Sequence, residues 1–141
     1  IPGFVEWFSY LDENKVKNIL GILKDRNISF LKSNDLKIGD KRIVENKEAI
    51  IKLVSHYIVN EKNHKGLPIN DVSRFHLGNG AIVDDILINA NISEAGFQRS
   101  FGIMINYLYE LKNIERNHEN YMNNSQVIIS DKVKKYLKKI T

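Results

Sequence analysis

Two hydrophobic periodicities within one chain of 141 residues most constrain its fold. From residue 45 or 46 to residue 59, apolar residues recur at the three- and four-residue spacing of a helix with one buried face. That face comprises Ile50, Leu53, Val54, Tyr57 and Ile58. Residues 81–88 instead have the pattern of a strand, with Ile82, Ile86 and Ile88 on one face. The mixture predicts a domain of the α+β or α/β class.

Weaker helical patterns cover two further segments. Residues 12–25 are predicted to form a helix with Asp12 or Asn14 as the N-cap, because apolar residues again recur at helical spacing. A third helix is predicted over residues 94–105. Residues 103–109 fit either a continuation of that helix or a strand, and their periodicity does not decide between the two.

The remaining segments are predicted to be loops, turns or an edge of the sheet. Pro2-Gly3 predicts a turn before an aromatic-rich start, and residues 127–129 fit a short strand. Asp84 and Asp85 interrupt the strand at 81–88, so we expect that strand at the edge of the sheet. Polar composition predicts loops over residues 27–40, 61–71 and 113–124.

The basic character of the chain is concentrated in one segment. The formal net charge is +4, but residues 132–139 hold five lysines and no acidic residue. The rest of the chain carries 16 basic and 17 acidic side chains, so no nucleic-acid partner is predicted. The segment is typical of an amphipathic helix that Ser130 or Asp131 caps, with lysines where the helix dipole favours them. Its inward face comprises Val133, Tyr136, Leu137 and Ile140.

Missing residue types and patterns exclude several classes of protein. The chain has no cysteine, which excludes a disulfide scaffold, a zinc–thiolate site and a cysteine nucleophile. No apolar run approaches 18 residues, so neither a transmembrane helix nor a membrane partner is predicted. The four histidines are not at metal-ligand spacing, and no metal site is predicted. They are His56, His64, His76 and His118.

One histidine and two tyrosines are candidates for chemistry. Phe75 and Leu77 flank His76, and a Gly-Asn-Gly sequence that predicts a tight turn follows it. A histidine there either hydrogen-bonds its own turn or transfers a proton near neutral pH, and the spacing leaves both open. Tyr107 and Tyr109 share a face if they lie on a strand; core packing suits one of them and a polar site contact the other.

Three segments, in order along the chain, resemble motifs of the malonyl-CoA decarboxylase family. Residues 75–81, Phe-His-Leu-Gly-Asn-Gly-Ala, resemble its F-H-L-x-N-G-A segment, and residues 100–109 are similar to its S-x-G-L-M-x-N-Y-x-Y segment. Residues 1–4, Ile-Pro-Gly-Phe, resemble the end of its S-P-I-P-G-F segment. Two positions depart from the family: Asn70-Asp71 stands for its N-P, and Leu87-Ile88 stands for its N-W, which affects the shape of the substrate pocket.

The resemblance implies an α+β fold in which helices pack on a mixed sheet. Residues 1–141 are expected to be a single partial domain, the C-terminal portion of a catalytic domain related to the GNAT acetyltransferases. The implied reaction converts malonyl-CoA to acetyl-CoA and carbon dioxide without a metal or organic cofactor. Malonyl-CoA is the expected partner, and an upstream helical domain is expected to assemble a homo-oligomer. The compartment stays open, with the cytoplasm as the favoured expectation.

The resemblance also assigns roles to individual residues. His76 and Tyr109 match catalytic residues of the family, and the family's catalytic serine falls two positions before Ile1. Asn79, Ser100 and Tyr107 are expected to contact the substrate. Two other readings remain open at this point: an inactive fragment or pseudoenzyme of the family, and a GNAT-type transferase that uses another acyl-CoA.

Overall fold

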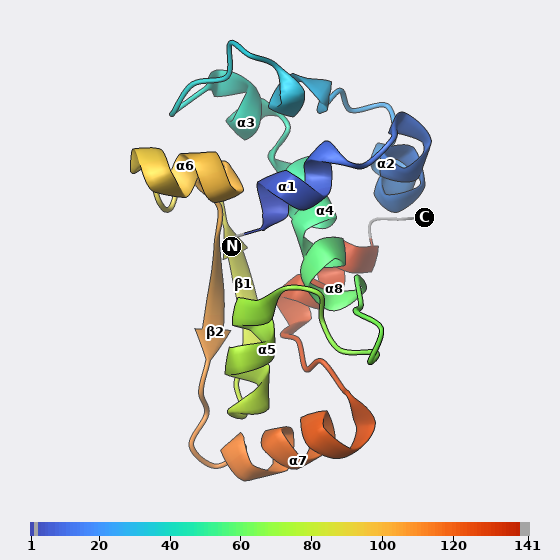
Figure 1. The fold of residues 1–141 in the computed structure, drawn as a ribbon, viewed down its shortest axis with the longest axis vertical. Helices are drawn as coiled ribbons and strands as arrows, with labels where there is room; N and C mark the ends of the chain where they lie inside the picture. The colour runs from blue at the N-terminus through green and yellow to red at the C-terminus, as the bar shows by residue number, and fades with distance from the viewer. Residues whose placement is uncertain (2, 139–141) are drawn as a thin grey trace.

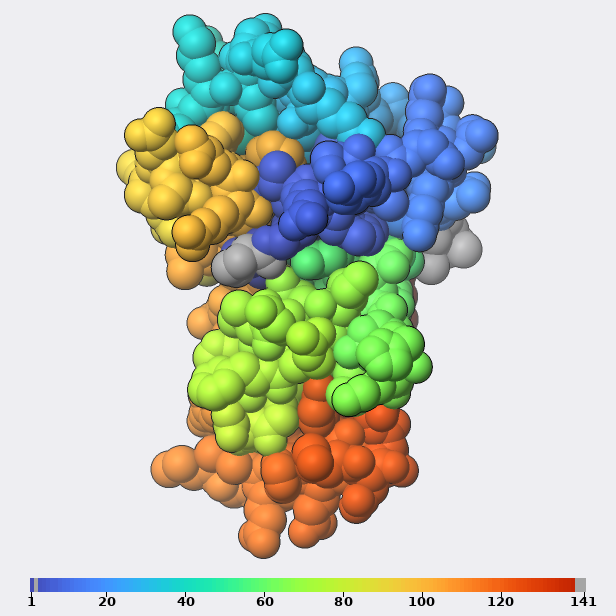
Figure 2. Space-filling model, viewed as in Figure 1, coloured from blue at the N-terminus to red at the C-terminus, as the bar shows by residue number. Residues whose placement is uncertain are grey.

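The computed structural model describes residue 1 and residues 3–138, which form an elongated α+β structure (Figures 1 and 2). The expected fold class is confirmed, because helices surround a small sheet. The expected relation to the GNAT fold and the assignment of residues 1–141 to one partial domain stay predictions. The helices are α1 (Phe4–Ser9), α2 (Glu13–Leu20), α3 (Lys41–Glu45), α4 (Lys47–Val59), α5 (Asp71–Gly78), α6 (Glu94–Ser100), α7 (Ile114–Asn124) and α8 (Asp131–Lys138).

The sheet consists of strands β1 (Ile82–Leu87) and β2 (Met104–Leu108), which run antiparallel. Their register pairs Val83 with Tyr107 and Ile86 with Ile105, and a bulge at Asp84 lies between these pairs. Because cross-strand partners share a face, the bulge places Val83, rather than Ile82, on the same face as Ile86. The expectation that Ile82 and Ile86 share a face is therefore wrong.

β1 is not an edge strand along its whole length. Val83 pairs with β2 on one side and forms an isolated parallel bridge with Ile129 on the other. The backbone N–H of Val83 donates to the carbonyl of Ile128, and the N–H of Ser130 donates to the carbonyl of Val83, both at 2.9 Å. The predicted strand at 127–129 thus amounts to one bridge. The expected edge position holds for β1 in the two-stranded sheet except at Val83, where the bridge to Ile129 covers the second side of the strand.

Helix α4 lies in the centre of the molecule and packs against α2, α8 and strand β1, and α8 also contacts β1 directly (Figure 1). All five residues of its predicted inward face are buried, which confirms that assignment. Ala49 and Ile51 are buried as well, so the helix is enclosed on more sides than a single apolar stripe requires. This explains why two polar residues, Lys52 and Ser55, are also buried in it.

Lys52 is a buried cation in the middle of α4. Its side chain is 2% exposed, and its Nζ has no hydrogen-bond partner among the residues that the structure describes. Burial lowers the pKa of this amine below its usual range. An unpaired buried amine is destabilising, because it has left water without gaining a replacement hydrogen bond.

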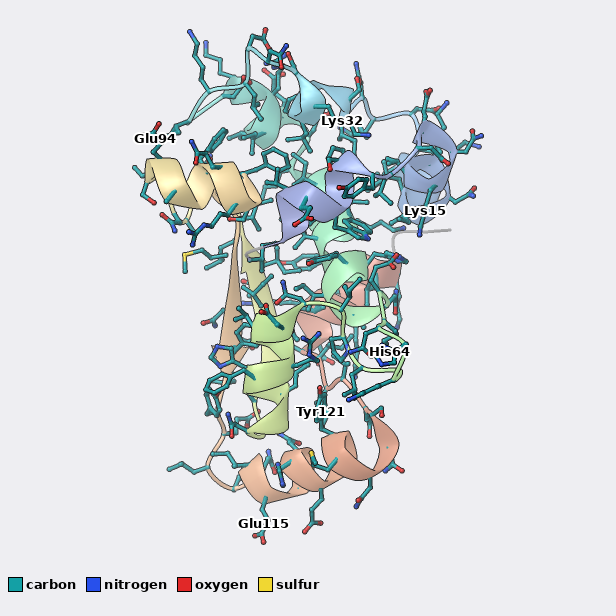
Figure 3. All side chains as sticks on the ribbon, in the orientation of Figure 1. Lys15, Lys32, His64, Glu94, Glu115 and Tyr121 are labelled. Atoms are coloured by element: carbon teal, nitrogen blue, oxygen red, sulfur yellow. The ribbon has the colours of Figure 1, made fainter. Side chains whose placement is uncertain are left out.

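The segment at 113–124, predicted to be a loop, is the helix α7. The side of α7 that contacts the end of α5 carries Ile114, Asn117, His118 and Tyr121, which have helical spacing, but two of the four are polar and His118 is exposed. The prediction was wrong because a face of this composition has no apolar periodicity. Tyr121 projects from α7 toward α5, and its ring approaches Gly78 (Figure 3).

Two predicted helices end earlier than expected. The helix predicted over 12–25 is α2, with Asp12 as its N-cap, and it passes into a 3-10 turn over Gly21–Leu23. The helix predicted over 94–105 is α6, which ends at Ser100 because Phe101 (φ +54°) and Gly102 (φ +79°) turn the backbone. Residues 104–108 are consequently a strand, which settles the alternative that the periodicity left open. The predicted loop at 27–40 contains a 3-10 turn over Ser29–Lys32.

The basic C-terminal segment forms α8, as predicted. The Ser130 hydroxyl accepts a hydrogen bond from the Val133 N–H at 3.2 Å, so Ser130 caps the helix. Val133 is buried, and Tyr136 and Leu137 are half-buried against the core. The expected turn at Pro2 and the expected inward position of Ile140 lie outside the described residues. No helix in the described part of the chain is long and apolar enough to cross a membrane.

Replacing Lys52 tests the cost of its burial. Lys52→Met keeps an unbranched apolar stem, one atom shorter, and removes the amine, so we expect the free energy of unfolding to rise by about 1–3 kcal/mol at neutral pH. Because the pKa of Lys52 is lowered by folding, the folded chain binds fewer protons here than the unfolded chain at pH values approaching 10.5. Stability of the unsubstituted chain therefore rises with pH in that window, and the advantage of Met shrinks.

Urea unfolding at several pH values measures both effects. Lys47→Met is the matched control, because Lys47 lies on the same helix and is exposed. A loss of stability in Lys52→Met larger than that of the control would contradict the expected cost of burying the amine.

Gly80 follows α5 and has φ +91°. A Cβ at this position lies 2.4 Å from the carbonyl oxygen of Ile114, so Gly80→Ala must push α7 away as well as strain the backbone. We expect a loss of about 1–3 kcal/mol beyond the backbone cost of about 1–2 kcal/mol. Gly66→Ala isolates the backbone cost, because Gly66 has φ +77° and no atom within 4 Å of the added Cβ. Equal losses in the two variants would show that α7 does not pack as described.

Candidate active site

His76 lies in the last turn of helix α5. Helix α5 begins at Asp71 because the buried side chain of Asn70 caps it, accepting a hydrogen bond from the Ser73 N–H at 3.0 Å. It continues through Gly78, so the tight turn expected around Gly78 and Gly80 starts later than predicted. The correction matters because His76 is held by a helix rather than by a loop.

Helix α7 holds the end of α5 in place. Asn117 is 4% exposed, and its amide donates to the Gly80 carbonyl at 3.1 Å. The Nδ1 of His118 donates to the Gly78 carbonyl. The second contact satisfies a carbonyl group that the end of the helix leaves without a partner, and the first fixes the chain two residues beyond that end. His118 was expected to be a loop histidine, and it is instead part of the support for α5.

The imidazole of His76 is fixed by two tyrosines from β2 and the residue after it. Its Nδ1 is 2.6 Å from the Tyr109 hydroxyl. Its ring stacks on the ring of Tyr107, with centroids 4.3 Å apart and planes inclined by 20°. Phe75 approaches the same imidazole edge-on at 5.2 Å. The prediction that Tyr107 and Tyr109 share a face agrees with this arrangement, because both reach His76.

The hydroxyl of Tyr107 is engaged elsewhere. It lies 2.6 Å from the Oγ of Ser73, a residue with no exposed surface. The chain of hydrogen bonds continues through Asn70. Its Oδ1 accepts from the Ser73 N–H, and its Nδ2 donates to the Tyr57 hydroxyl at 3.3 Å. A polar network therefore links the core helix α4, the start of α5 and strand β2.

The two tyrosines have different surroundings. Burial raises the pKa of Tyr107 to about 12, although its hydrogen bond to Ser73 opposes the change. This hydroxyl is therefore protonated at physiological pH. Tyr109 is 40% exposed and His76 is half-buried, so their contact faces an open surface. Within the described residues, the Nε2 of His76 has no hydrogen-bond partner.

The structure brings three of the five predicted site residues together: His76, Tyr107 and Tyr109. Asn79 is adjacent to them but exposed, and its side-chain amide donates to the Phe75 carbonyl of its own helix at 2.9 Å. Ser100 is separate. It is buried in α6, where its hydroxyl donates to the Gly96 carbonyl, and it precedes β2, whereas Tyr109 follows that strand (Figure 1).

The other histidines do not join this cluster. His56 pairs with Glu61 at 3.0 Å, and His64 lies in the loop between α4 and α5 (Figure 3). No group of three or more His, Cys, Asp or Glu side chains in the described residues could hold a metal ion.

Sequence reasoning missed Ser73 and Asn70. The signal for them is local: an Asn at the N-cap accepts a hydrogen bond from the backbone N–H of the residue three positions later. Ser73 and His76 are also three apart on one helix, which places them on the same face. Their link to Tyr107 spans 34 residues of sequence and has no local signal.

Comparison with known proteins identifies the family. The family model "Malonyl-CoA decarboxylase C-terminal domain" matches residues 1–141. Mitochondrial malonyl-CoA decarboxylase of Mus musculus is 31% identical over 94% of this chain, and that of Anser anser anser is 28% identical over 94%. The crystal structure of malonyl-CoA decarboxylase from Rhodopseudomonas palustris matches 96% of the chain with a TM-score of 0.83 and 30% identity. The Cupriavidus metallidurans structure matches 96% with a TM-score of 0.76 and 29% identity.

These matches cover only part of each relative. The chain spans 30% of the length of the mouse and goose proteins, 31% of the R. palustris chain and 36% of the C. metallidurans chain. The family model nevertheless matches the chain from its first residue to its last. The chain therefore belongs to the malonyl-CoA decarboxylase family and corresponds to the C-terminal domain of its members.

Proposed function

We propose that this chain is the part of a malonyl-CoA decarboxylase that supplies the proton-transfer group, His76. The observation that carries the proposal is the arrangement of the imidazole. One face stacks on Tyr107, Nδ1 contacts the Tyr109 hydroxyl, and Nε2 has no partner among the described residues. A ring fixed at one nitrogen and unengaged at the other is suited to exchange a proton with a bound molecule.

The chemistry needs such a group at one step. Cleavage of the bond between the carboxylate and the α-carbon of a malonyl thioester releases carbon dioxide and leaves the electron pair as an enolate. An acid must then deliver a proton to the α-carbon, which yields the acetyl thioester. We assign that delivery to the Nε2 of His76; as this proton leaves, the hydrogen-bonded Tyr109 hydroxyl passes its own proton to Nδ1, and solvent then reprotonates the tyrosine. Hydrogen-bond donors near the thioester oxygen stabilise the enolate while it exists.

Tyr109 selects the tautomer of the neutral ring. A phenol hydroxyl that donates to Nδ1 leaves the proton of neutral imidazole on Nε2, where the acid is needed. We therefore assign to Tyr109 the donor role in the 2.6 Å contact. The proposed catalytic pair is His76 and Tyr109, as the family resemblance implies.

Other parts of the proposal concern residues outside this cluster. The family's serine, expected two positions before Ile1, stays a prediction, as do substrate contacts from Asn79 and Ser100. Ile1 donates from its amino nitrogen to the Ile103 carbonyl at 3.3 Å, next to the strand that leads to Tyr107. We also propose that the whole protein is a homo-oligomer assembled through a helical domain outside residues 1–141, which light scattering of the whole protein tests. Its proposed compartment is the cytoplasm.

Substitution of His76 tests the proposed acid. In the whole protein that carries this domain, we expect His76→Gln to lower kcat for release of carbon dioxide from malonyl-CoA by about 100–10,000-fold. Circular dichroism should show an unchanged fold. His64→Gln is the matched control, because it removes an exposed histidine from a loop of the same domain. Turnover near the original rate in His76→Gln contradicts the assignment.

Tyr109→Phe tests the hydrogen bond to Nδ1. The variant keeps the ring and removes the donor, so we expect the His76 tautomer with the proton on Nδ1 to increase and kcat to fall by about tenfold or more. Nitrogen-15 spectra of the imidazole report the tautomer directly. Tyr10→Phe, at a residue that is 82% exposed, is the control. An unchanged tautomer would exclude the proposed donor role.

The assay also separates the other two readings. Product formation that requires an added acyl acceptor, without release of carbon dioxide, indicates an acyl-CoA transferase. Binding of malonyl-CoA without turnover, in a protein with an intact fold, indicates a pseudoenzyme.

A further inference from the structure

We infer that Tyr107 and Ser73 are positioning residues that fix the plane of the His76 ring. The inference deepens the proposed function and rests on it, since it explains how the acid is aimed. It also gives Tyr107 a role different from the substrate contact that the sequence predicts.

Tyr107 is held at two points by one face of one helix. Ser73 and His76 are three residues apart on α5, so their side chains lie one turn from each other. The Tyr107 hydroxyl reaches the first at 2.6 Å, and its ring lies against the second at a centroid distance of 4.3 Å. The tyrosine thus spans the turn, and movement of its ring toward or away from His76 requires breaking the hydrogen bond to Ser73.

The hydrogen bond that anchors the Tyr107 hydroxyl is rigid, because Ser73 and the residues behind it are bonded to the core. Ser73 has no exposed surface, and its N–H is bound by the buried Asn70. Asn70 donates in turn to Tyr57, which lies on α4 and is 4% exposed. A hydroxyl fixed in this way gives Tyr107 one position, and the near-parallel stack gives the imidazole one plane.

The two tyrosines consequently act through different parts of their side chains. Tyr109 acts through its hydroxyl, which contacts Nδ1. Tyr107 acts through its ring, since its hydroxyl is occupied by Ser73 and remains protonated. The hydroxyl of Tyr107 is therefore an anchor, and neither gives nor takes the proton of the reaction.

This division predicts an unusual order of effects on kcat in the whole protein. Tyr107→Leu removes the stack and should lower kcat by about 100-fold with little change in KM. Ser73→Ala leaves the partly buried Tyr107 hydroxyl without its partner, so the ring shifts and kcat should fall by about tenfold. Adding Tyr107→Phe to Ser73→Ala removes the unsatisfied hydroxyl while keeping the ring, and should restore kcat to within about threefold.

Tyr136 supplies the matched control. Its hydroxyl donates a partly buried hydrogen bond to Asp85 at 2.7 Å, and burial raises its pKa to about 12, as for Tyr107. Tyr136 differs in lying on α8, away from His76. Tyr136→Leu and Tyr136→Phe should therefore affect stability without changing kcat or the imidazole spectrum.

Nitrogen-15 spectra of His76, recorded without substrate, separate this inference from the proposed function. We expect Tyr107→Leu to broaden or split the imidazole signals, Ser73→Ala to shift them, and the double variant to restore them. If the protein proves not to decarboxylate malonyl-CoA but these changes occur, the positioning role stands and the proposed function fails. A rise in KM at constant kcat, with unchanged imidazole signals, would falsify the positioning role and return Tyr107 to the substrate-contact role. If Tyr107→Leu fails to fold, Ser73→Ala and the double variant decide the question.

Discussion

The register of β1 against β2 is the constraint on which the candidate site depends. Helix α5 leads into β1 after a turn of a few residues, so His76 lies close to the start of that strand. Antiparallel pairing sets Ile82 opposite Leu108 and Val83 opposite Tyr107, which brings the end of β2 to the same place. A shift of one residue would turn Tyr107 and Tyr109 to the opposite face, away from α5. The meeting of histidine and tyrosines therefore follows from strand pairing, and needs no long or flexible loop.

The bulge at Asp84 keeps that register compatible with the core. With the extra residue, Val83 and Ile86 face the same side, where they pair with Tyr107 and Ile105. Without it, the two aspartates would place a charge at a buried position of the strand. Asp84 instead accepts a hydrogen bond from Asn106 at 3.0 Å, and Asp85 accepts one from Tyr136. The inserted residue thus lets Val83 and Ile86 stay buried in a strand that also contains two adjacent aspartates.

The sequence predicted those parts of the fold whose stabilising residues are apolar and regularly spaced. Helix α4 and strand β1 belong to this class, and so does the amphipathic α8. Helix α7 was missed because its contacts with the end of α5 come from two polar side chains, the buried Asn117 and the exposed His118, which bind the carbonyls of Gly80 and Gly78. The site divides in the same way. His76 and Tyr109 lie in recognisable motifs, whereas the contact of Ser73 with Tyr107 depends on a tertiary pairing that no local pattern contains.

Asparagine makes up 17 of the 141 residues, which invites the view that each one reflects composition alone. Two of them are nevertheless buried and make the contacts that locate α5 at both ends: Asn70 caps its first turn, and Asn117 binds the carbonyl of Gly80 just beyond its last. An amide is suited to this task because it offers both a donor and an acceptor to backbone groups that a helix end leaves unpaired. His76 is therefore carried on a helix fixed at both termini, and its two tyrosines come from a paired strand and the residue that follows it. A site built on such elements keeps its geometry although it faces open solvent in this chain.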